Sequence, residues 1–170
     1  MSLTDRETLA ALHGMVFGAL FLLAFAGGFA GLYSLRPALL TPQGIVERTR
    51  RLMLGTWAMA IVAWATVITG TFVVYPWYRA KLPTSPKSLI LANINTADWH
   101  NFGMEWKEHI AWLAPILATV VAVVVAYYGI RLIKHQRLRV FLMLIFTLAF
   151  ASAGVAGLFG AFITKVAPIH

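Results

Sequence analysis

The stretch that decides the fold is HIAWLAPILATVVAVVVAYYGI, residues 109–130. It contains no Asp, Glu, Lys or Arg, and it is longer than the ~20 residues that an α-helix needs to cross a membrane. Three further runs lack these charged residues: Thr8–Leu35, Leu52–Tyr78 and Val140–Thr164. No alternation of apolar and polar residues persists in any of them, which argues against β-barrel strands. The sequence therefore predicts an all-α integral membrane protein, a bundle of four helices.

The composition excludes several other classes of protein. The chain has 170 residues, of which 60% are hydrophobic and 12% are charged, too apolar a balance for a soluble domain. It has no cysteine, which excludes disulfides, thiolate metal sites and c-type haem attachment. The formal net charge of +8 would suit a nucleic-acid partner. The basic residues instead gather in short loops between apolar runs, so we expect no nucleic acid and a lipid bilayer as the surroundings.

We expect one transmembrane domain over residues 1–170. The first apolar run continues beyond a possible cleavage site at residues 24–26, so we interpret it as a retained helix and not as a signal peptide. Thr4 and Glu7 have the spacing of a capping box at the start of this helix. The expected helices lie at about 5–35, 52–78, 104–133 and 140–166, with a long loop at 79–103 between the second and third.

The distribution of charge predicts the orientation. The loops at 36–51 and 131–139 together hold eight basic residues and one acidic residue, Glu47. The other side of the membrane holds six basic and five acidic residues. Because basic loops stay in the cytoplasm, both termini and the long loop are predicted to lie outside. We expect a multi-pass protein of the cytoplasmic membrane of a bacterium or archaeon.

Two histidines are predicted to lie at the same depth in the membrane. His13 precedes Arg36 by 23 residues and His109 precedes Arg131 by 22, which gives heights of about 35 Å and about 33 Å above the inner edge. The first and third helices run in the same direction, so both imidazoles reach the outer leaflet. Two such side chains can bind the iron of one haem b from opposite faces.

Neighbouring residues suit the same cofactor. Gly14 and Gly18 follow His13 and leave room for the edge of a porphyrin. Arg79 and Lys107 are placed to neutralise the haem propionates. No histidine lies near the inner leaflet, so a second haem and electron transfer across the whole membrane are not expected. The metal ligands predicted for the single haem iron are His13 and His109.

With two histidines on separate helices of a small bundle, the chain resembles the haem b membrane-anchor subunits of respiratory oxidoreductases, of the succinate dehydrogenase type. The resemblance covers the helix arrangement together with His13 and His109. It implies a b-type cytochrome subunit that carries electrons between quinol and a redox partner near the outer face. Such a subunit works with other membrane or outer-face proteins and is not a stand-alone enzyme, so no catalytic residue is assigned.

Two other functions remain open. Stripes of small residues, such as Gly27 with Gly31, also suit a cofactor-free structural subunit of a respiratory or photosynthetic complex. A non-haem metal site or a proton-handling site is the further alternative. Its candidates are Glu105 and His100, which lie close in sequence to His109. The spacing of these three residues matches no strong metal-binding motif.

Overall fold

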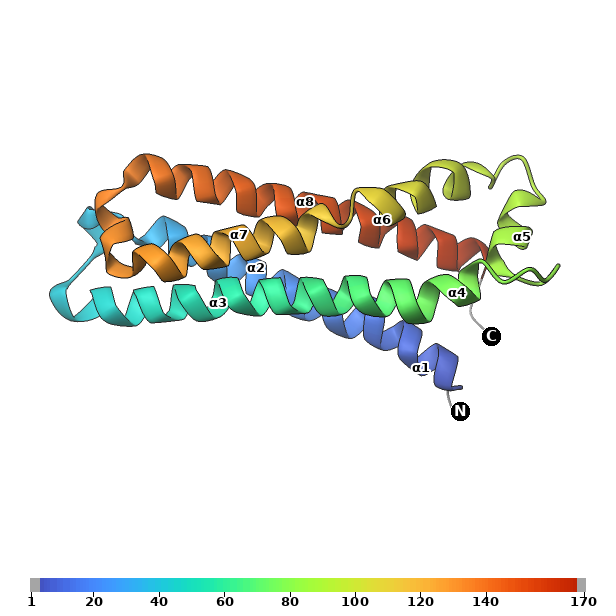
Figure 1. The fold of residues 1–170 in the computed structure, drawn as a ribbon, viewed down its shortest axis with the longest axis horizontal. Coiled ribbons are helices and arrows are strands. Elements are labelled where there is room, and N and C mark those ends of the chain that lie inside the picture. Colours follow the sequence, from blue (N-terminus) through green and yellow to red (C-terminus); the bar gives the residue numbers. More distant parts are fainter. Residues whose placement is uncertain (1–3, 168–170) are drawn as a thin grey trace.

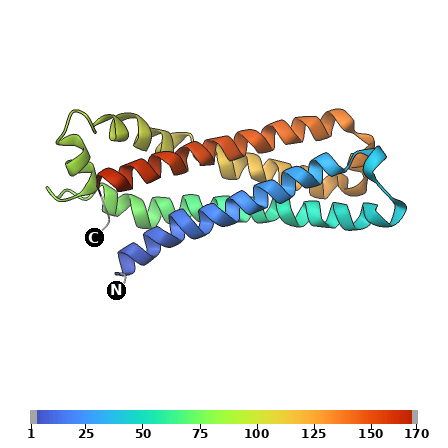
Figure 2. The same cartoon turned by 180° about the vertical axis from the view of Figure 1, so that it is seen from behind.

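The computed structural model describes residues 4–167, apart from the side chain of Ala38. These residues are mostly helical and contain no strand, and four long helices follow one another up and down (Figures 1 and 2). Each is long and apolar enough to cross a membrane, so the predicted all-α class and the four apolar spans are confirmed. We number these spans helices 1 to 4; they cover Asp5–Ser34, Pro42–Tyr78, Trp99–Lys134 and Gln136–Val166.

Helices 1 and 2 are each interrupted by a π-helical turn, in which one extra residue is accommodated in the helix. Helix 2 is followed by the short helix α5 (Pro86–Leu91) in the long loop. The segments of helix 1 are α1 (Asp5–Ala11), η1 (Leu12–Val16) and α2 (Phe17–Ser34), and those of helix 2 are α3 (Pro42–Thr69), η3 (Gly70–Val74) and α4 (Tyr75–Tyr78).

Helix 3 is the least regular of the four, and helix 4 is continuous. Helix 3 also begins with a π-helical turn and is broken between His109 and Leu113. The break precedes Pro115, which has no N–H to offer the carbonyl of Ala111; that carbonyl instead accepts from the N–H of Ala114 at 3.1 Å. The segments are η4 (Trp99–Met104), α6 (Glu105–His109), α7 (Leu113–Tyr128) and η5 (Gly129–Lys134), followed by α8 (Gln136–Val166).

Capping side chains fix where the helices begin. Thr4 and Glu7 form the predicted capping box, and Ser85 caps α5 by accepting from the N–H of Ser88. Helix 2 begins at Pro42, well before residue 52, because Thr41 accepts from the N–H of Gly44 and proline suits the first helical position. Arg48, Arg50 and Arg51 therefore lie within the first turns of a helix and not in a loop, whereas Arg36 remains in the connection.

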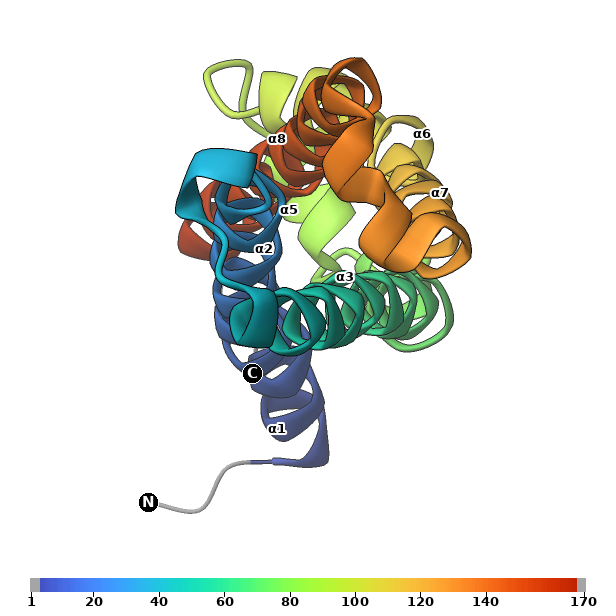
Figure 3. The same cartoon turned by 90° about the vertical axis from the view of Figure 1, so that its left-hand side faces the viewer.

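The packing order places helices 1 and 3 diagonally across the bundle. Helix 1 packs on helices 2 and 4, and helix 3 packs on the same two helices (Figure 3). Phenylalanines join helix 1 to helix 4: the rings of Phe25 and Phe150 stack with centroids 4.1 Å apart, and Phe146 is fully buried. Close to them Gly28 allows helix 1 to approach, since an added Cβ there would lie 2.7 Å from the Phe146 ring.

Both ends of the described chain, together with the 79–98 connection, lie at one end of the bundle, which we call the long-loop end (Figure 1). Helix 1 diverges from the bundle there, and neither α1 nor η1 has a buried residue. An added Cβ at Gly14 or Gly18 would meet nothing within 4 Å, so these glycines make no close helix contact. The tight packing lies in the other half of helix 1.

Candidate functional site

His13 is held by helix 2 in one defined orientation. Its Nδ1 lies 3.0 Å from the hydroxyl oxygen of Thr69. Thr69 donates its only hydroxyl proton to backbone carbonyls of its own helix, with the Ala65 oxygen at 2.7 Å. With its proton directed to the Ala65 carbonyl, the Thr69 oxygen can accept a hydrogen bond from Nδ1–H of His13. In that arrangement the neutral ring has its lone pair on Nε2.

Gly70 provides the surface on which the His13 ring rests. An ideal Cβ on Gly70 would lie only 2.9 Å from Cε1 of His13, so a side chain larger than hydrogen would displace the ring. His13 lies in the π-helical turn η1, and Gly70 begins the π-helical turn η3. Such turns change the direction in which side chains project and occur often at functional sites. Two π-helical turns thus meet where the His13 ring rests on Gly70.

Lys107 supplies a positive charge inside the same half of the bundle. Its Nζ donates to the backbone oxygen of Ala156 in helix 4 at 3.1 Å, and Gly160 makes room for it. Within residues 4–167 no carboxylate forms a salt bridge with Lys107. Lys107 is also close enough to His13 to interact with it electrostatically. Cations within a membrane span are costly, and they commonly mark a functional site.

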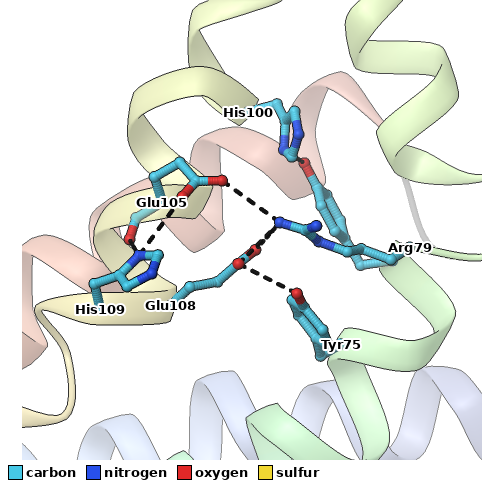
Figure 4. Close-up of polar contacts among 7 residues, drawn as sticks. Tyr75, Arg79, His100, Glu105, Glu108 and His109 are labelled. Carbon is cyan, nitrogen blue, oxygen red and sulfur yellow. Dashed lines mark hydrogen bonds and ion pairs between the residues drawn. The ribbon is translucent and has the colours of Figure 1, made fainter.

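A second polar group, which we call the Arg79 cluster, comprises Tyr75, Arg79, Glu105, Glu108 and His109 (Figure 4). Nη2 of Arg79 lies 2.8 Å from both carboxylate oxygens of Glu108 and 3.5 Å from Glu105. The hydroxyl of Tyr75 donates to Glu108 at 3.2 Å. The hydrogen bond to Glu108 raises the pKa of Arg79 above its ordinary value. Helices 2 and 3 are thus joined by ionic contacts at the long-loop end.

His109 lies at the edge of this cluster. Its Nδ1 is 2.9 Å from the backbone oxygen of Glu105 and 3.6 Å from the carboxylate of that residue. A carbonyl only accepts hydrogen bonds, so Nδ1 carries the proton and the lone pair is again on Nε2. The side chain of His109 is 68% exposed. It therefore has the tautomer of a metal ligand, but it is less firmly held than His13.

His100 forms a separate pair with Tyr78. Both side chains are buried, and Nδ1 of His100 lies 3.0 Å from the Tyr78 hydroxyl (Figure 4). The pair joins the π-helical turn η4 to the end of helix 2. The hydrogen-bond partner of His100 is therefore different from the partners of His13 and His109. In the part of the chain that the structure describes, no three His, Asp or Glu residues are arranged to hold a metal ion.

The predicted site residues divide between these groups. No hydrogen bond or ring contact among the described residues joins His13 to His109, which lie on diagonal helices and have different partners. Glu105 contacts His109 and Arg79, and the guanidinium of Arg79 is already paired with Glu108. Of the two cations expected to meet propionates, Arg79 is paired with Glu108, whereas Lys107 forms no salt bridge with any carboxylate of residues 4–167.

Several residues at these sites were not singled out from the sequence as site residues: Thr69, Gly70, Tyr75 and Tyr78. A hydroxyl residue directly before a glycine inside an apolar span was a usable signal for the first two. Tyrosines at the end of an apolar span are typical of the aromatic belt at a membrane surface, so the sequence alone does not mark these two as site residues. Comparison with protein families, with curated proteins and with solved structures gave no match to this chain.

Proposed function

We propose that this chain is a membrane-embedded electron-transfer subunit that binds one haem b in the half of the bundle next to the long loop. His13 is the first axial ligand in this proposal. The observation that carries it is the environment of the His13 ring, whose Nδ1 lies 3.0 Å from the Thr69 hydroxyl and whose edge rests on Gly70.

Histidines that bind metals through Nε2 usually donate Nδ1–H to a fixed acceptor, which sets the tautomer and the direction of the ring. Thr69 is that acceptor here. Lys107, which has no acidic partner among the described residues, would balance the charge of a propionate. The haem, when bound, supplies one-electron redox chemistry. The protein's own contribution is to orient the ligand, to balance the charge and to surround the site with apolar side chains.

His109 is the proposed second ligand. It has the same tautomer as His13, and its exposed side chain is free to turn. His13 and His109 have separate hydrogen-bond partners, so replacing each should have a different effect on the haem. By the positive-inside rule the long-loop end faces outward. A haem there suits the exchange of electrons between membrane quinol and a partner at the outer surface.

The test is the optical spectrum of the purified protein, produced with ample haem, together with that of three variants. We expect a reduced-minus-oxidised haem b spectrum with one haem per chain, lost in His13→Ala. In His109→Ala the haem should remain but become high-spin, as loss of one axial ligand requires. His135→Ala, at the other end of the bundle, is the matched control and should keep the spectrum unchanged. A colourless wild-type protein would end the proposal, and co-purification of that protein with a large complex would favour a structural subunit.

A proton-handling role for the Arg79 cluster is the second candidate. It is favoured by the direct link between two carboxylates, a tyrosine hydroxyl and an imidazole at the membrane boundary. The assay is proton flux through vesicles that contain the purified chain. Flux that falls in Glu108→Gln and persists in Glu47→Gln, at the other end of helix 2, would support this role. Equal flux with and without the protein would exclude it.

A further inference from the structure

Residues of helices 1 and 2 and of the long loop line a groove at the long-loop end. Figure 1 shows that α1 diverges from α4 at this end. The volume of the groove is about 450 Å³, within the range of ligand sites in proteins. Helix 1 supplies one wall, and α4 with the start of the long loop supplies the other. The lining residues are Arg6, Leu9, Ala10, Val73, Val74, Pro76, Trp77, Ala80, Leu82, Thr84 and Ser85.

The lining changes from apolar to polar along helix 1. Leu9 and Val73, on facing walls, are 44% and 38% exposed, so the apolar part of the groove is not closed by protein. Arg6 lies one turn nearer the end of the helix, in the first turn after the Thr4 cap, and its guanidinium is 5.7 Å from the centre of the Trp77 ring. Tryptophan and arginine at the end of an apolar span are typical of the level of lipid head groups.

The charge of the groove selects the sign of its ligand. Among the described residues that line it, Arg6 is the only charged one. The cation–π contact with Trp77 holds the guanidinium at the mouth of the groove. Guanidinium groups bind phosphate through paired hydrogen bonds, and the hydroxyl of Thr84 in the same lining is a further donor. An anionic group is therefore favoured at this level, above an apolar section.

We propose that this groove binds one anionic phospholipid, with its phosphate against Arg6 and an acyl chain against Leu9 and Val73. The order of the lining residues matches the order of phosphate, glycerol and acyl chain in such a lipid. The lipid would also cover the apolar side chains that the divergence of helix 1 leaves without a protein partner. This inference does not depend on haem binding, because it concerns a different set of residues.

The test is native mass spectrometry of the full chain, released from detergent after titration with phosphatidylglycerol or with phosphatidylcholine of the same acyl chains. We expect one tightly retained phosphatidylglycerol and an affinity for phosphatidylcholine that is about fivefold lower. Arg6→Gln should reduce the affinity for phosphatidylglycerol to that for phosphatidylcholine. Lys81→Gln removes one positive charge from the long loop, at a residue that does not line the groove, and it should leave the preference for phosphatidylglycerol unchanged. Ala10→Trp, which fills the groove, should abolish binding of both lipids.

Other outcomes would overturn the proposal. Equal retention of the two lipids by the wild-type chain, or an unchanged preference in Arg6→Gln, would show that Arg6 does not select the ligand. Displacement of the lipid by millimolar inorganic phosphate would show a simple anion site. Displacement by a short-chain quinone, with no effect of Arg6→Gln, would show a site for a neutral ring. Thermal unfolding of each variant confirms that a loss of binding is not a loss of fold.

Discussion

Replacing Gly70 by alanine should displace the His13 ring without unfolding the protein. The new Cβ would lie 2.9 Å from Cε1 of His13, whereas ordinary contacts begin at 3.4 Å, so the ring must move by about half an ångström. The hydrogen bond from His13 to Thr69 is 3.0 Å long and cannot survive such a shift without weakening.

The effects on stability nearly cancel. A weakened hydrogen bond costs about 0.5–1.5 kcal/mol. Alanine in place of glycine inside a helix contributes about 1 kcal/mol in the opposite direction. The free energy of unfolding should therefore change by less than about 1 kcal/mol. Haem affinity should fall about tenfold or more, because mutation of the residues that orient a metal ligand typically has that effect.

The assay is titration of the haem-free protein with haem, followed by quenching of tryptophan fluorescence. Gly27→Ala is the matched control: it adds the same methyl group to a glycine inside a helix, but the new Cβ meets nothing within 4 Å. Gly27→Ala should keep the wild-type affinity for haem. Equal affinities in the two variants would refute the conclusion that the contact with Gly70 orients His13. A loss of helical circular dichroism in Gly70→Ala alone would refute the conclusion that the two effects on stability nearly cancel.

Two further predictions concern stability. Gly28→Ala should destabilise the bundle by about 1–3 kcal/mol because the new Cβ overlaps a buried phenylalanine ring. The adjacent Gly27→Ala has open space around its new Cβ and should be neutral or stabilising. Unfolding in mixed micelles measures both variants, and a change of the same sign in both free energies of unfolding would contradict the packing. Glu108→Gln should cost about 2 kcal/mol and the exposed Glu47→Gln less than about 0.5 kcal/mol in the same assay. The cost of Glu108→Gln should not diminish between about pH 7 and about pH 10, because the raised pKa of Arg79 keeps it charged throughout; a cost that vanished at the higher pH would show that another group is paired.

The spans were predictable because length and the lack of charge are properties of a single run of sequence. The start of helix 2 was placed at residue 52 because the prediction followed the apolar boundary. The capping signal Thr41-Pro42 lies earlier, and the helix begins there with its basic residues included. Three π-helical turns were not predicted, since an inserted residue in a helix depends on packing between helices.

The candidate site was predictable only in part. His13 was identifiable as a histidine inside an apolar run, and the calculated depth gives the half of the bundle in which it lies. Its partner Thr69 could not be identified from the sequence, because a contact between helices depends on the rotation of each helix about its axis. That His13 and His109 bind one haem iron was predicted from their equal depth, and it stays a prediction. Helices 1 and 3 lie diagonally, and each histidine has its own hydrogen-bond partner.

Chemical rescue of a His13→Gly variant tests most directly whether this histidine holds a haem iron. The variant removes the imidazole and leaves a space of its shape, in which free imidazole can bind. We predict that the purified variant lacks the haem b spectrum and regains it when millimolar imidazole and haem are added together. A variant that keeps the wild-type spectrum without imidazole would contradict ligation by His13, and so would one that never recovers it while remaining folded.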